Sequence, residues 1–194
     1  MERSVFAVLI LLALPIVSAA SIDMKSSYSQ GETIIAKIDA NFFNPLKEEN
    51  VFFYRGHVSI PMDYDVGKVG DYYYIKASLI GKTSGNYSIK IENAFYYKEG
   101  RVTDEDIIKN FSITSSIADF SIDPGFVISI GNFSIKARNL QDSSITINIE
   151  KPSELSSINS LNLYSGQIKE IDFDTSRING DFPSVIKLKT SSLT

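Results

Sequence analysis

The sequence predicts an all-β fold, and two observations lead to that prediction. From Ser21 onward the dominant spacing of apolar residues is two, which is typical of half-buried strands. The stretches with this spacing are short, and Gly, Pro and Asn turn signals separate them. Residues 21–194 are therefore expected to form sheets packed face to face.

The first unit is expected over residues 21–114. Within segment 32–42, Ile34, Ala36 and Ile38 face one way, while Lys37 and Asp39 face the other. The other expected strands of this unit are 50–54, 58–60, 71–79, 86–92 and 107–113. Short strands at this spacing, in roughly 90 residues, favour an immunoglobulin-like β-sandwich.

One detail refines the sandwich prediction. Leu79, Gly85 and Tyr87 place a tyrosine just after a glycine turn, at the start of the penultimate strand. The arrangement resembles the tyrosine corner of fibronectin type III and macroglobulin-like domains. That resemblance implies a hydroxyl bonded back to the preceding loop. The Leu-to-Tyr spacing is longer than in the usual fibronectin pattern, so the subfamily stays open.

A second unit is expected over residues 115–194, after a short linker at Thr114–Ser116. Its expected strands are 118–122, 126–130, 132–139, 145–149, 167–174 and 184–189. Its order of turns and strands, which includes Asp123-Pro124-Gly125, resembles exported prokaryotic immunoglobulin-like modules over most of 115–190. A sandwich normally closes with one more strand. Either 153–164 contains that strand, or the chain is part of a longer protein.

The amino terminus has the form of an export signal. A short polar start precedes the apolar run Val5–Val17, and small residues follow it at Ser18–Ser21. The run is shorter than the roughly 20 residues that a membrane-spanning helix needs. Residues 1–20 are therefore predicted to be a cleaved signal peptide, with an uncleaved anchor as the alternative. The predicted location is secreted or at the cell surface.

Composition excludes several classes of chemistry. The chain has no cysteine, which removes disulfides, thiolate nucleophiles and a lipid-modified amino terminus, and which favours a prokaryotic, for example archaeal, source. The formal net charge of −4 provides no basic footprint for nucleic acid. His57 is the only histidine, and nothing in its extended, glycine-flanked surroundings points to a catalytic base. We expect no catalytic residues.

Aromatic residues are the richest feature of the first unit, where they occur in adjacent pairs and triplets. Neighbouring residues on a strand point to opposite faces, so one member of each pair should lie outside the core. Exposed aromatic rings stack on sugars or anchor protein interfaces. A ligand-facing patch is predicted from Phe43, Tyr72, Tyr74 and Tyr96; simple cross-strand pairing is the alternative.

Two further kinds of site are candidates. The carboxylates of Asp104, Glu105 and Asp106 follow one another and offer the oxygen ligands that calcium prefers. Thr103 and Asp106 also fit the capping box of one solvated turn. No other cofactor is expected. Asparagine glycosylation sequons begin at Asn86, Asn110 and Asn132.

Together these features predict a non-catalytic secreted or cell-surface protein whose modules serve adhesion, spacing or envelope assembly. The expected partner is an envelope protein or polysaccharide. Membrane contact is expected only through an uncleaved signal or an anchor beyond Thr194. The alternative is the amino-terminal accessory region of a larger exported enzyme, such as a protease or glycosidase. A macroglobulin-like inhibitor fragment is a third class, and it would lack the thioester cysteine.

Overall fold

The computed structural model describes residues 20–190, and the predicted signal peptide lies outside this part except for Ala20. The described residues form strands joined by turns, with one short 3-10 helix at Glu48–Asn50. The all-β prediction is confirmed. No helix among residues 20–190 is long and apolar enough to cross a membrane.

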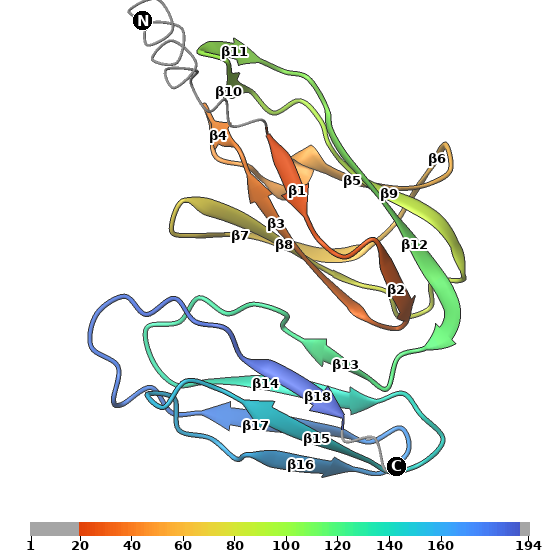
Figure 1. Cartoon of the computed structure of the whole chain (residues 1–194), viewed down its shortest axis with the longest axis vertical. Coiled ribbons are helices and arrows are strands. Elements are labelled where there is room, and N and C mark those ends of the chain that lie inside the picture. The colour runs from red at the N-terminus through yellow and green to blue at the C-terminus, as the bar shows by residue number, and fades with distance from the viewer. Residues whose placement is uncertain (1–19, 191–194) are drawn as a thin grey trace, which may run out of the picture.

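Two large sheets and one small sheet make up the first body, which forms the upper part of Figure 1. The four-stranded sheet has the order β1 (Ser21–Asp23), β3 (Thr33–Asp39), β8 (Tyr72–Ser78), β7 (Asp63–Val69). The five-stranded sheet has the order β2 (Ser27–Gln30), β12 (Ile107–Ile117), β9 (Gly85–Ile91), β5 (Val51–Arg55), β6 (Val58–Ile60). The small sheet has the order β11 (Arg101–Thr103), β10 (Tyr96–Lys98), β4 (Asn41–Phe42).

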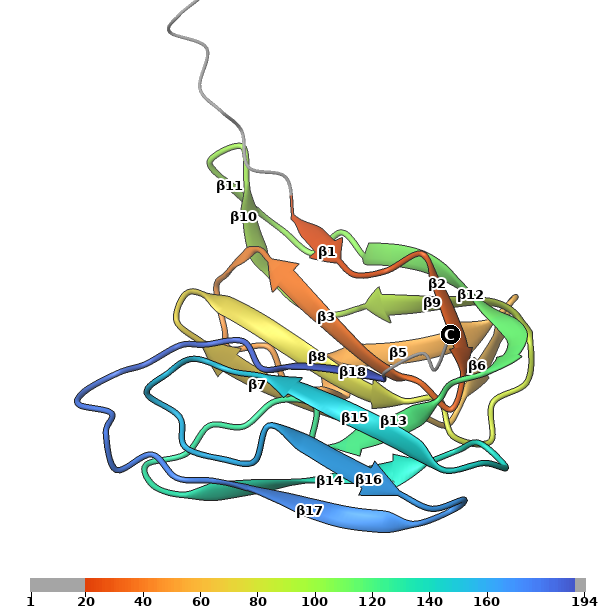
Figure 2. The same ribbon diagram turned by 60° about the horizontal axis from the view of Figure 1, so that its bottom comes forward.

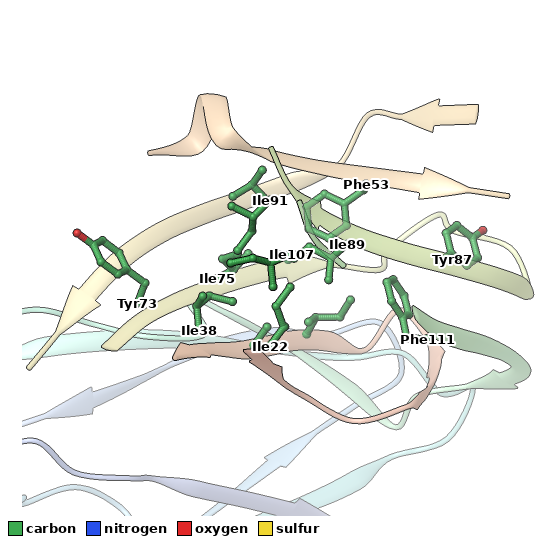
Figure 3. Close-up of a cluster of buried hydrophobic side chains, with 14 of the residues drawn as sticks. Ile22, Ile38, Phe53, Tyr73, Ile75, Tyr87, Ile89, Ile91, Ile107 and Phe111 are labelled. Carbon is green, nitrogen blue, oxygen red and sulfur yellow. The ribbon is translucent and has the colours of Figure 1, made fainter. Parts of the chain in front are cut away.

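The alternation noted in the sequence becomes the core between the two large sheets. Ile38 and Ile75 come from the four-stranded sheet, and Phe53, Ile89 and Ile91 come from the five-stranded sheet (Figure 3). All five side chains are at most 2% exposed. Burying an aliphatic or aromatic side chain this completely stabilises the fold by roughly 1.5–3 kcal/mol. The core therefore holds the first body together without a disulfide.

The predicted tyrosine corner is present. The Tyr87 hydroxyl donates a hydrogen bond to the carbonyl oxygen of Thr83, at 2.7 Å. The Tyr87 ring stacks on Phe111 of the neighbouring strand, with 5.7 Å between ring centroids. One side chain thereby ties the loop before β9 to the core.

The second body lies below the first in Figure 1 and has its own core. One sheet has the order β13 (Phe120–Asp123), β14 (Phe133–Asn139), β17 (Ile168–Phe173). The other has the order β16 (Ser160–Leu163), β15 (Ile145–Glu150), β18 (Lys187–Thr190). Ile147, Leu163 and Phe173 are at most 1% exposed between the sheets. Of the two alternatives for this unit, the structure does contain a strand within 153–164, namely β16.

Two local predictions are wrong. Residues 126–130 form no strand, although their apolar residues alternate: Pro124 and Gly125 turn the chain, and Ile128 is 66% exposed. The segment Thr114–Ser116 is not a linker, because β12 continues through it to Ile117. The two bodies are instead joined by residues 118–119.

Candidate functional site

Within each aromatic run, some rings lie in the core and others on the surface, because alternate residues of a strand face opposite sides of the sheet. On the inner face of the small sheet, Phe42 and Tyr96 pair in register, and their rings meet edge to face with centroids 6.2 Å apart. Tyr96 is only 3% exposed, and burial raises its pKa above the ordinary tyrosine value. The prediction that Tyr96 belongs to a ligand-facing patch is therefore wrong.

The outer face of the small sheet carries the exposed members of these runs. Tyr97 lies opposite Val102 in register, and its ring centroid is 6.2 Å from that of Phe43. The backbone amide of Phe43 donates a hydrogen bond to the carbonyl oxygen of Phe95, at 2.8 Å. We call these residues the aromatic surface: Phe43 (59% exposed), Phe95 (47%), Tyr97 (41%) and Val102 (50%).

Tyr72 and Tyr74, the other predicted members, lie elsewhere. Both are half-buried on the outer face of β8, in the four-stranded sheet. The ammonium of Lys37 lies 3.4 Å from the centroid of the Tyr72 ring, so a cation–π contact already covers that ring. Only Phe43 of the four predicted residues lies in the aromatic surface. A one-residue shift of phase, from Tyr96 to Tyr97, explains part of the error.

Two of the three predicted calcium ligands, Glu105 and Asp106, form ion pairs with lysines. Glu105 pairs with Lys98 at 2.5 Å, and Asp106 pairs with Lys90 at 2.7 Å. Hydrogen bonds to these carboxylates raise the pKa of both lysines above the ordinary value. Asp104 is exposed. Among residues 20–190, no three carboxylate or imidazole side chains lie close enough together to hold a metal ion.

The sequon asparagines are all exposed. The pairing of β9 with β12 brings two sequons together, since Asn86 lies opposite Ser112 and Asn110 lies opposite Ser88. These four residues help to line one open depression on the surface. Asn132 lies in the second body, where its side-chain oxygen accepts a hydrogen bond from the Thr175 amide at 3.0 Å. The cross-strand pairing of two sequons could not be seen from their spacing in the chain.

A polar cluster at the junction of the two bodies was not predicted. Lys76 of β8 lies on an outer face, where a lysine is normally solvated, yet its side chain is only 6% exposed. Its ammonium contacts Asp65 of β7 at 3.2 Å and also Asp123 of β13. The hydroxyl of Thr33 donates a hydrogen bond to the carbonyl oxygen of Ile122, at 3.0 Å.

The charge of Lys76 is balanced within this cluster. Burial lowers the pKa of Lys76, but the hydrogen bonds to Asp123 and Asp65 outweigh that effect, and the net shift is upward. The ammonium therefore stays charged at neutral pH. The carboxylates of Asp65 and Asp123 remain more than half exposed. The buried ammonium is therefore paired with two anions that are in contact with solvent.

Close packing accompanies the ion pairs. A methyl group added at Gly67 would overlap the ring of Phe126, and one added at Gly31 would lie 2.6 Å from the δ1 carbon of Leu140. Gly31 and Gly67 belong to the first body, while Phe126 and Leu140 follow β13 and β14 in the second. The two bodies thus meet at van der Waals distance on several elements.

Comparison with known proteins yields little. No family model matches the sequence, and no curated protein matches it. A crystal structure of trypsin-activated alpha-2-macroglobulin from Escherichia coli is a distant structural match, with a TM-score of 0.25 and 10% sequence identity. The match covers 88% of this chain but only 17% of that one.

Proposed function

We propose that the chain is a non-catalytic, exported protein of the cell surface or the extracellular medium. Its two bodies, residues 21–117 and 120–190, act as tandem immunoglobulin-like modules in adhesion, spacing or envelope assembly. The apolar run before Ser18 supports export. The separate cores of the two bodies support a division into modules.

The observation that carries the proposal is the junction around Lys76. Modules joined by a flexible linker move independently, whereas ion pairs and close packing across a junction hold two modules in one orientation. Here the small sheet with the aromatic surface lies at the end of the first body farthest from the second body (Figure 1, Figure 2). If the two bodies keep one orientation, the aromatic surface stays at a fixed distance from the far end of the second body. A spacer requires such a fixed distance.

The partner that fits this arrangement is a component of the cell envelope. Exposed aromatic and aliphatic side chains gathered on one face mark an interaction surface. The aromatic surface gathers four such side chains at one end of the pair. The opposite end carries the second body, which is then free to meet the surroundings of the cell.

Export is tested with a reporter enzyme that is active only outside the cytoplasm, fused after Thr194. We expect reporter activity from the natural sequence and its loss in a Leu11→Arg/Leu12→Arg variant, because two charges interrupt the apolar run. The matched control places one arginine at the exposed Ile128, where activity should persist. An inactive reporter on the natural sequence, with the fusion protein present in the cytoplasm, would refute the proposal.

A further inference from the structure

The aromatic surface lies beside the point where the amino-terminal segment joins the fold. Ser21, the first residue of β1, is opposite Asp39 at the end of β3. Asn41, two residues further along, is opposite Tyr97 in the small sheet. Two residues of extended chain cover about 7 Å. Both views show β1 and the β10–β11 pair at the same end of the first body (Figure 1, Figure 2).

The sequence that precedes β1 contains an apolar run. Residues 18–20 alone separate the run Val5–Val17 from β1. The run is shorter than the roughly 20 residues needed to cross a bilayer. When an apolar segment is shorter than the hydrocarbon layer, flanking residues are drawn into the interface. The aromatic surface lies at the same end of the first body as Ser21, the first residue of β1 (Figure 1).

The chemistry of the surface suits a lipid interface. Phenylalanine, tyrosine and valine supply apolar area, and the hydroxyl of Tyr97 can remain hydrated among headgroups. Arg101, next to Val102 in β11, is exposed and supplies a positive charge near lipid phosphates. Lys98 lies opposite Arg101 in the same hairpin and pairs with Glu105.

We propose that the apolar run 5–17 is retained as an uncleaved anchor, the alternative to the cleaved signal peptide, and that the aromatic surface rests in the interfacial layer of the membrane that holds this run. This inference rests on the proposed export of the chain and identifies the envelope component as lipid. The first body then lies on the membrane with the small sheet inward, and the second body is held away from it. The run acts as an anchor, and the aromatic surface sets the orientation of the protein on that anchor.

The chain has no tryptophan, so one introduced tryptophan is a specific probe. We would replace Phe43 by Trp in the full chain, Met1–Thr194, and reconstitute it in phosphatidylcholine vesicles. The emission should shift to shorter wavelength, and lipids with brominated acyl chains should quench it. Tyr97→Trp should behave in the same way. Val58→Trp in β6 is the matched control: Val58 is 67% exposed, and its emission should remain water-like and unquenched.

Three results would overturn the inference. The first is water-like, unquenched emission from Phe43→Trp in vesicle-bound protein, which would leave the surface free for a protein or polysaccharide. The second is failure of the full chain to float with the vesicles. The third is a blue-shifted emission that brominated lipids do not quench, which would mean that residues 5–17 cover the surface themselves. In each case the reporter assay decides independently whether the chain is exported.

Discussion

Lys76 and Asp123 form an ion pair that links the two bodies, although they lie 47 positions apart in the chain. The lysine contributes a nearly buried ammonium from β8, and the aspartate contributes a carboxylate from the end of β13. Asp65 of β7, in the first body, is the second carboxylate that contacts this ammonium. The ion pair with Asp123 therefore contributes, together with the packing of Phe126 and Leu140, to the orientation of one body relative to the other.

Removing the ammonium should loosen the junction. In Lys76→Met the apolar stem remains while both ion pairs are lost; the carboxylates, which are more than half exposed, become rehydrated. We expect a loss of about 1 kcal/mol of unfolding free energy in urea. We also expect a larger and more variable radius of gyration by small-angle X-ray scattering.

The matched control for this variant is Lys136→Met. Lys136 pairs with Glu170 at 3.8 Å on the exposed surface of the second body, so both measurements should stay unchanged. Identical scattering curves for Lys76→Met and the natural protein would show that the ion pairs do not hold the junction.

A methyl group at Gly67 should force Phe126 out of the junction. The added carbon overlaps the phenyl ring, and Phe126 is only partly buried, so its ring can move outward. Gly67→Ala should lower stability by about 1 kcal/mol through overpacking. Gly131→Ala is a suitable control, because no atom lies within 4 Å of the added methyl group. Equal melting temperatures for the two variants would contradict the close packing described.

Removal of the Tyr87 hydroxyl tests the tyrosine corner. Tyr87→Phe keeps the stacked ring but leaves the carbonyl oxygen of Thr83 without this donor. The expected cost is about 1 kcal/mol in urea denaturation. Tyr164→Phe removes a hydroxyl from a residue that is 71% exposed, and it should cost nothing measurable. A Tyr87→Phe protein as stable as the natural one would mean that the hydrogen bond makes no net contribution.

Tyr28 should make the fold sensitive to alkali. Burial raises the pKa of Tyr28 from 10.0 to about 12. Below pH 10 both the folded and unfolded states keep the proton, and the contribution to stability is complete. Between pH 10 and 12 only the unfolded state ionises, so stability falls, by up to about 3 kcal/mol.

This pH dependence is measured by urea unfolding at a series of pH values. Tyr28→Phe should show a shallower decline of unfolding free energy between pH 10 and 12 than the natural protein. A decline of equal slope in both proteins would mean that the loss comes from other groups.

Much of the fold was predictable from local pattern. The alternation around Ile38 in β3 and around Ile89 in β9 depends only on the period of an extended chain, which the residues themselves show. The Tyr87 corner was expected from the resemblance to fibronectin type III and macroglobulin-like domains, and its acceptor at Thr83 lies only four positions away. The candidate sites were less predictable, because they depend on the phase of short strands. The predicted outward-facing residue was wrong by one position: Tyr96 is buried, and its neighbour Tyr97 is exposed.

The sequence by itself determined the strand-rich class of the protein and the alternating apolar residues of its two cores. The tertiary structure decided which strands pair, that residues 126–130 stay outside the sheets, and that Lys76 meets Asp123 across the junction. It also placed the aromatic surface beside the first residue of β1. The physical reason is that alternation is a property of neighbouring residues, whereas pairing and burial at a junction depend on segments far apart in the chain.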